Sequence, residues 1–155
     1  MNLPASHPMS FSRGEISVLI MPHMANILGD LFGGNLMALV DQAAAIAAIR
    51  HAGGRVVTAS IHKVDFRERI PIGSLVTCRS TVDFVGRSSM DITVEVFCEI
   101  PSTGERKHAN TAHLVFVAID AEGRPVEVPR LIPGTDEEKA RYAEAERYRK
   151  EHGVR

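Results

Sequence analysis

The chain has 155 residues, of which 45% are hydrophobic and 24% charged, with a formal net charge of −1. This composition is typical of one globular domain over residues 1–155. The near-neutral charge and the lack of Trp argue against a nucleic-acid partner. No basic start precedes an apolar run at the N-terminus, and no apolar stretch reaches the roughly 20 residues that span a bilayer. We therefore expect a cytoplasmic protein without a membrane contact.

A predicted strand over residues 14–20 leads through a loop to a helix that begins at Gly33 and Gly34. A second glycine pair at 53–54 ends this helix. Four further segments are rich in β-branched residues and partly or cleanly alternate in polarity, which is the period of a half-buried strand. They are residues 55–66, 74–86, 89–100 and 107–120. Because short turns join the last three, we expect antiparallel pairing.

The C-terminal segment is different in character. Thr135 followed by Glu138 matches a capping box, which predicts a helix over residues 135–151. Its charges alternate and it has little apolar face. The sequence leaves open whether this helix is solvated or packs onto a neighbouring subunit.

The first helix is almost wholly apolar between Leu36 and Ile49, apart from Asp41 and Gln42. A helix of this kind must be buried nearly all round. One antiparallel sheet of about five strands can wrap around it, and a second copy of the chain can cover what remains. The expected class is therefore α+β, with a core over about residues 14–132, and the layout is similar to the hotdog fold.

Asp41 also belongs to a pattern. Asn26-x-x-Gly29, then Gly33-Gly34 and then Asp41 resembles the signature of hotdog acyl-CoA thioesterases of the YciA and brain acyl-CoA hydrolase type. The resemblance covers residues 15–132 and continues through the segments RVVTASIHKVDF, GRSSM, HANT and VAIDAEGRPVEVP. It departs in FRERIPIG, where similar proteins place the proline earlier and Arg69 stands here. That departure bears on the loop conformation and the substrate fit, but not on the family.

The resemblance implies hydrolysis of fatty acyl-CoA to free acid and coenzyme A, without a metal or other cofactor. The residues themselves suit this chemistry, because Asp41 offers a carboxylate that attacks the thioester or activates water. A glycine pair that opens a helix exposes N–H groups without intrahelical partners, which can stabilise an oxyanion. A non-catalytic regulatory module that binds acyl-CoA is the alternative. Such modules carry a DNA-binding helix-turn-helix, which the first thirteen residues cannot form.

The spacing of these residues points to a dimer. Asp41 lies seven residues beyond Gly34, or about 10 Å along a helix. The glycine turn and the Asp41 of the same chain are therefore too far apart to contact the same thioester carbonyl. Two antiparallel helices across a two-fold axis would bring Asp41 of one chain to the glycine turn of the other. The resemblance implies the same dimer, and further suggests three dimers in a hexamer.

Other residues have two interpretations each. Asn26 either orients the thioester or the attacking water, or caps local backbone. We expect Gln42 to be a polar contact at the dimer seam and not a catalytic group. Thr58 and Ser60 alternate on their strand, so we expect both to face the helix and line the acyl or pantetheine channel.

Coenzyme A carries phosphates, for which a turn offers N–H groups as well as side chains. We expect Arg87, Ser88 and Ser89 in the GRSSM turn to bind them, unless this is a simple hairpin turn with a solvated arginine. Arg67 and Arg69 serve either a phosphate or a surface ion-pair cluster.

The remaining candidates argue against metal or redox chemistry. His108 and His113 are five positions apart on a predicted strand, so we expect them on opposite faces and not around one metal. Cys78 and Cys98 lack metal-ligand spacing and are expected to be buried thiols. The acyl chain length, and the choice between attack by Asp41 and activation of water, stay open.

Overall fold

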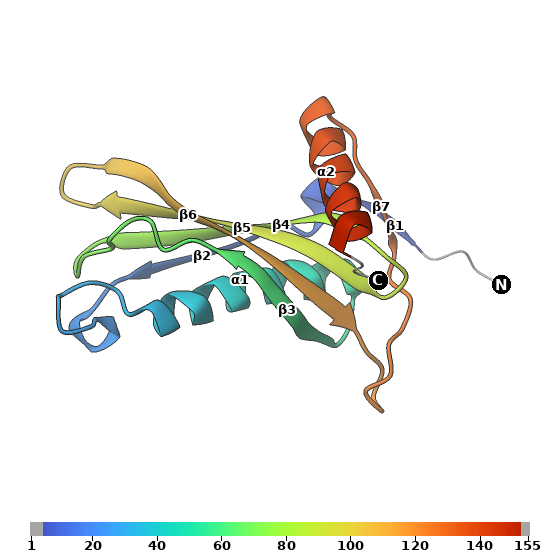
Figure 1. Ribbon diagram of the computed structural model, residues 1–155, viewed down its shortest axis with the longest axis horizontal. Helices are drawn as coiled ribbons and strands as arrows, with labels where there is room; N and C mark the ends of the chain where they lie inside the picture. The colour runs from blue at the N-terminus through green and yellow to red at the C-terminus, as the bar shows by residue number, and fades with distance from the viewer. Residues whose placement is uncertain (1–4, 153–155) are drawn as a thin grey trace.

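The computed structural model describes residues 5–152 (Figure 1). Its two long helices lie on opposite sides of one large sheet, α1 along one face and α2 near one end of the other. In chain order the elements are β1 (Ser6–Pro8), η1 (Met9–Phe11), β2 (Gly14–Leu19), η2 (Pro22–Met24), α1 (Gly33–Ala52), β3 (Val56–Val64), β4 (Leu75–Val85), β5 (Ser89–Ile100), β6 (Glu105–Ala118), β7 (Arg130–Ile132) and α2 (Asp136–His152).

The large sheet has five strands in the order β2-β4-β5-β6-β3, and every neighbouring pair is antiparallel. The predicted sheet, central helix and C-terminal helix of the hotdog fold are thus confirmed, with ends that differ by a residue or two. The small parallel sheet of β1 and β7 was not predicted, because three-residue strands carry too little alternation to detect. Neither helix in residues 5–152 is long and apolar enough to cross a bilayer.

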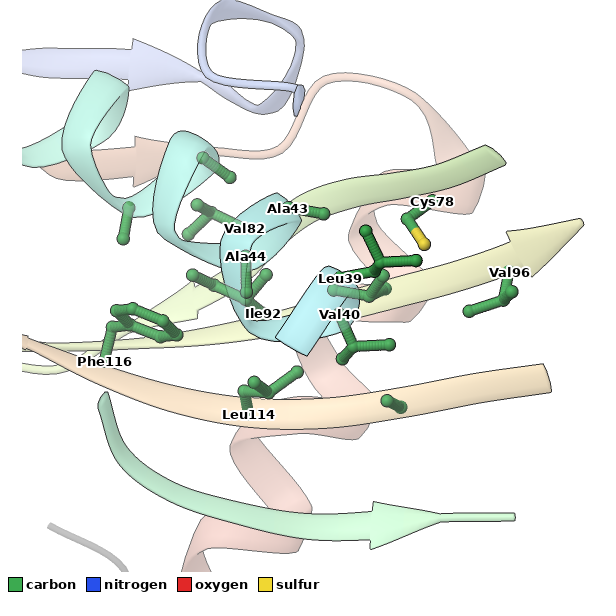
Figure 2. Close-up of a cluster of buried hydrophobic side chains, with 14 of the residues drawn as sticks. Leu39, Val40, Ala43, Ala44, Cys78, Val82, Ile92, Val96, Leu114 and Phe116 are labelled. Carbon is green, nitrogen blue, oxygen red and sulfur yellow. The ribbon is translucent and has the colours of Figure 1, made fainter. Parts of the chain in front are cut away.

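The main core lies between α1 and the concave face of the sheet. The helix begins directly after Phe32 and ends at Gly53, whose φ of 74° is left-handed and whose N–H donates to the Ile49 carbonyl. Burying each Leu or Val of this core contributes about 1.5–3 kcal/mol. Figure 2 shows the helix residues Leu39, Val40, Ala43 and Ala44 against Val82, Ile92, Leu114 and Phe116 of the sheet.

The sheet covers only one side of α1. Gly34, Ala38, Gln42 and Ile49 are exposed and Asp41 is half-buried, and these positions follow one another at helical spacing. They form a stripe that we call the bare stripe of α1. It consists mostly of small or apolar residues, with a carboxylate and an amide at its middle. One chain therefore leaves the catalytic candidate Asp41 on the uncovered side of its helix.

A bulge in β3 corrects the prediction for Ser60. Thr58 pairs with Phe116 and Ser60 pairs with Val115, so one residue of β3 is extra between them. Adjacent residues of β6 face opposite sides of the sheet, and cross-strand partners face the same side. Thr58 therefore shares the core face with Phe116, whereas Ser60 lies on the opposite face. The expectation that both face the helix holds for Thr58 alone.

A second bulge corrects the prediction for the two histidines. Val96 pairs with Asn110 and Phe97 pairs with His108, which leaves one residue of β6 extra. His113 pairs with Thr93, four positions before Phe97 on a regular strand, so both histidines lie on the same outer face. The prediction of opposite faces was wrong, because the extra residue reverses the alternation. Even so, residues 5–152 contain no group of three or more side chains placed to hold a metal.

The C-terminal helix packs onto the outer face of its own sheet, which neither sequence interpretation anticipated. The capping box is confirmed, since the Glu138 N–H donates to Thr135 Oγ1 over 3.1 Å and the Thr135 N–H donates to Glu138 Oε1 over 3.0 Å. Farther along, Arg141 Nε donates to Asp83 Oδ1 over 2.9 Å. Burial raises the pKa of Asp83, and the Arg141 charge opposes that shift. Ion pairs and a few ring contacts, such as Tyr142 on Phe84, hold this helix in place of a continuous apolar stripe, so hydrophobic periodicity could not reveal its packing.

Both cysteines, Cys78 and Cys98, are buried and free, as expected. Burial raises the pKa of the Cys78 thiol to about 12, so it stays protonated at neutral pH. A protonated, inaccessible thiol is a poor nucleophile. The carboxylate on α1 remains the better candidate for chemistry.

Candidate active site

Asp41 lies in the middle of α1, where one of its oxygens is fixed by the neighbouring strand. Thr58 Oγ1 donates to Asp41 Oδ1 over 2.7 Å. Asp41 Oδ2 accepts no hydrogen bond from another residue between 5 and 152. The hydroxyl offsets part of the cost of placing a carboxylate on an apolar helix and holds its orientation. The second oxygen stays available to a substrate or a water molecule.

The glycine pair forms the open N-terminus of α1. Phe32 at the N-cap contributes no side-chain hydrogen bond to the first turn. The N–H groups of Gly33 and Gly34 therefore lie at the positive end of the helix dipole, and no capping side chain from residues 5–152 binds them. A Cβ on Gly34 would lie 2.6 Å from a ring carbon of Phe32, and one on Gly33 would lie 3.6 Å from the ring of Phe66. Glycine thus keeps this helix end accessible to a flat group such as a thioester.

The loop before α1 is built around Asn26. Its Oδ1 accepts from the N–H groups of Leu28 (2.9 Å) and Asp30 (3.2 Å). These bonds match the local capping role, and they leave its Nδ2 without a described partner. Asn35 Nδ2 donates to the Met24 carbonyl over 3.0 Å, which ties the loop to the start of the helix. Asn26 and the glycine pair are therefore parts of one rigid unit.

Arg69, which stands where the family pattern in FRERIPIG has the proline, forms an ion pair with the loop before α1. Its Nε donates to Asp30 Oδ2 over 2.6 Å, so it braces the loop that carries Asn26. Arg67 pairs with Asp65 at 3.0 Å, and Glu68 pairs with Lys107 at 3.0 Å. These contacts match the ion-pair interpretation for Arg67 and Arg69.

Within one chain the two halves of the candidate site stay apart. Asp41 and Thr58 form one half, and Asn26, Gly33 and Gly34 form the other. About 10 Å of helix separates Asp41 from Gly34. Asp41 of one half and Gly34 of the other lie on the bare stripe, so a second helix laid against the stripe would contact a residue of each half.

The GRSSM turn joins β4 to β5, and Arg87 at its tip is exposed. The Ser89 side chain is buried and its Oγ accepts from Arg149 Nη2 over 2.7 Å. Met90, which follows the turn on β5, and Thr58 on β3 both pair with Phe116 on β6, the strand between them. Two strand spacings, or roughly 10 Å, therefore separate the end of the turn from Thr58, which binds Asp41. A long substrate whose reacting group lies at Asp41 can therefore extend its other end toward this turn.

Two arginines that were not predicted from the sequence also contact this turn. Arg149 of α2 reaches Ser89, and Arg130 of β7 donates to the Gly86 carbonyl over 2.7 Å. Both lie more than 40 positions after the turn. Nothing in local spacing could have found them, because only the packing of α2 and β7 brings them there.

Comparison with known proteins identifies the family of this chain. The family model of the thioesterase superfamily matches residues 28–105. YkhA of Bacillus subtilis, described as an uncharacterized acyl-CoA thioester hydrolase, is 45% identical over 119 residues, which are 77% of this chain and 69% of that protein. The chain spans only 38% of the length of the human cytosolic acyl coenzyme A thioester hydrolase, to which it is 33% identical.

Solved structures lead to the same family. An acyl-CoA hydrolase from Staphylococcus aureus, in complex with butyryl coenzyme A and coenzyme A, superposes with a TM-score of 0.88 at 35% identity and covers 96% of this chain and 91% of that one. An apo-hexameric acyl-CoA thioesterase gives a TM-score of 0.90 at 37% identity, over 97% and 98% of the two chains. The chain therefore belongs to the thioesterase superfamily, in the group of hotdog acyl-CoA thioester hydrolases.

Proposed function

We propose that this protein is a cytoplasmic acyl-CoA thioesterase that hydrolyses fatty acyl-CoA to free acid and coenzyme A. One catalytic domain carries the activity, and coenzyme A enters only as part of substrate and product. The observation that carries the proposal is the carboxylate of Asp41, fixed through one oxygen by Thr58 and open at the other. The names of the relatives give the substrate class.

Variants of the Staphylococcus aureus hydrolase support the choice of residues. Structures of that enzyme exist with alanine in place of an aspartate, an asparagine and a threonine. The three residue types occur there in the same order and at the same spacings as Asn26, Asp41 and Thr58 here. The asparagine variant is described in complex with coenzyme A.

The chemistry needs two contributions. Asp41 either removes a proton from a water molecule that attacks the thioester carbon, or attacks that carbon itself to give an anhydride that water then hydrolyses. In both routes the C–S bond breaks and coenzyme A leaves as the thiolate, which takes up a proton. The N–H groups of Gly33 and Gly34 stabilise the oxyanion that forms on the carbonyl oxygen. Asn26, in the same unit as the glycines, orients the thioester or the water.

The site becomes complete in a homodimer. Two bare stripes laid antiparallel place Asp41 of one chain against the glycine turn of the other, so each dimer has two composite sites. Gln42 then lies at the seam as a polar contact. The free edge of β3 lies beside the same stripe, and a second copy would cover this edge as well. The hexameric neighbour structures support three such dimers in a hexamer.

The phosphates of coenzyme A are assigned to the turn of residues 86–89, with Arg87 and Ser88 at its outer side and Ser89 at its base. Arg87→Ala should raise KM for acyl-CoA about tenfold, because a charge-assisted hydrogen bond to a phosphate is lost. Hydrolysis of an acyl thioester of N-acetylcysteamine, which lacks the nucleotide, should be nearly unchanged. The phosphates bind far from the reacting carbon, so kcat should stay within about twofold.

Arg124→Ala provides a matched control, since Arg124 is an exposed arginine in another turn. It should leave KM for both substrates unchanged. Equal losses for the two substrates in Arg87→Ala would mean that Arg87 supports the fold and that the nucleotide binds elsewhere.

A further inference from the structure

The turn of residues 86–89 keeps its backbone carbonyls engaged with the protein. Each carbonyl oxygen accepts a hydrogen bond from a donor in another part of the fold or across the hairpin. The pairs are Gly86 O with Arg130 Nη2 (2.7 Å), Arg87 O with Val128 N (2.8 Å), Ser88 O with Ala118 N (2.9 Å) and Ser89 O with Gly86 N (2.8 Å). Because the acceptors are directed to these donors, an anion on the outer side meets N–H groups and the Arg87 side chain.

Arg149 of α2 lies against both ends of this turn. It is buried, and its Nε and Nη2 donate to the two carboxylate oxygens of Asp91 over 2.8 and 2.9 Å. Its Nη2 also donates to Ser89 Oγ over 2.7 Å. At the other end, a Cβ on Gly86 would lie 2.5 Å from Arg149 Nη1. One bidentate pair with Asp91 and one hydrogen bond to Ser89 thus hold the base of the turn, in a planar geometry that a lysine could not reproduce.

Arg130 contributes a charge that no carboxylate of residues 5–152 balances. Its Nη2 donates only to carbonyls, those of Gly86, Val128 (2.9 Å) and, more weakly, Arg87 (3.4 Å). It forms no ion pair with a carboxylate of residues 5–152, and its Nε is buried without a hydrogen-bond partner. A half-buried, unpaired guanidinium is costly in a folded protein, and an anion bound nearby offsets that cost. The charge lies directly behind the turn.

We propose that Arg130 and Arg149 are positioning residues for coenzyme A. Arg149 fixes the shape of the turn, and Arg130 holds its carbonyls inward and adds a positive charge behind the bound phosphate. Neither side chain needs to touch the substrate. This inference rests on the proposed function, and specifically on the assignment of residues 86–89 to the phosphates.

The test compares Arg130→Gln and Arg149→Gln with Arg141→Gln, in the full-length enzyme. Arg141 is a matched control because it is on the same helix and pairs with a buried aspartate, Asp83, but does not touch the turn. Each variant is assayed with acyl-CoA and with the acyl thioester of N-acetylcysteamine, and inhibition by adenosine 3′,5′-bisphosphate is measured. Arg130→Gln and Arg149→Gln should raise KM for acyl-CoA and Ki for the bisphosphate about tenfold, with kcat and the short thioester nearly unchanged. Arg141→Gln should shift none of these values, and it is combined with Asp83→Asn so that no buried carboxylate is left unpaired.

Arg149→Gln leaves the buried Asp91 unpaired and can detach α2, so a second variant is needed. The double variant Arg149→Gln/Asp91→Asn removes the unpaired charge and should show the same selective rise in KM. Equal losses with both substrates in the double variant and in Arg130→Gln would overturn the proposal, as would unchanged KM and Ki. If the proposal for Arg130 and Arg149 fails in this way but Arg87→Ala raises KM for acyl-CoA alone, the turn still binds coenzyme A. If Arg87→Ala is not selective, the phosphate assignment fails and this inference fails with it.

Discussion

Asp41→Asn is expected to fold and assemble normally and to lose at least about 10²-fold in kcat. The amide is nearly the same size, and Thr58 can still donate its hydroxyl proton to the amide oxygen. The amide can neither accept a proton from water at neutral pH nor attack a thioester, so both routes to the product are blocked. The measurement is the rate of thiol release from acyl-CoA, with the Tm and the oligomeric mass recorded for the same samples.

Asp136→Asn is the control, because Asp136 lies in the first turn of α2 on the other side of the sheet from α1. It should keep full activity. If Asp41→Asn retained more than half of the wild-type kcat, Asp41 would have to be a structural carboxylate, and another group would perform the chemistry.

Most of what positions Asp41 could be predicted from the sequence. The long apolar run with glycine pairs at both ends defines α1, and the alternation of residues 74–86 and 89–100 defines the two central strands. Thr58 was expected to face the helix, and its hydroxyl donates to Asp41. These features are local, so they are visible in the chain without knowledge of the fold.

Bulges and ion pairs account for the wrong predictions. One extra residue near Thr58 reverses the facing of Ser60, and one near Asn110 brings His108 to the same face as His113. A bulge leaves no mark in a short β-branched segment, since the alternation simply changes phase. The docking of α2 depends on buried carboxylates that lie about 58 positions earlier in the chain, such as the partner of Arg149. The charged composition of α2 therefore gave no sign that it packs on its own sheet, and the sequence left open only a solvated helix or a contact with a neighbouring subunit.

The same limit applies to the proposed coenzyme site. The sequence proposes Arg87, Ser88 and Ser89 because they lie in a short turn between two strong strands. Arg130 and Arg149 reach that turn only through the packing of β7 and α2. A residue that positions another residue belongs to no sequence motif, so only its contacts in the folded chain can identify it.

The second large effect is expected when two inactive chains are mixed. In Gly34→Val the new side chain would meet the Phe32 ring and project from the bare stripe, so the oxyanion site of that chain is blocked. An Asp41→Asn chain lacks only the carboxylate. In a heterodimer, one of the two composite sites combines an intact Asp41 with an intact glycine turn. Co-refolding the two inactive chains in equal amounts should therefore restore about a quarter of the wild-type activity, since half of the dimers are mixed and each has one working site.

Different affinity tags on the two chains allow the heterodimer to be isolated and its activity measured directly. Refolding either variant alone is the control and should give no recovery. A double variant, Gly34→Val/Asp41→Asn, mixed with wild-type chains should leave no working site in the heterodimer, because each site then contains one defective half. Active heterodimers in that second mixture, or inactive ones in the first, would show that each chain completes its own site. The separation of Asp41 from Gly34 along one helix, about 10 Å, argues for the shared site.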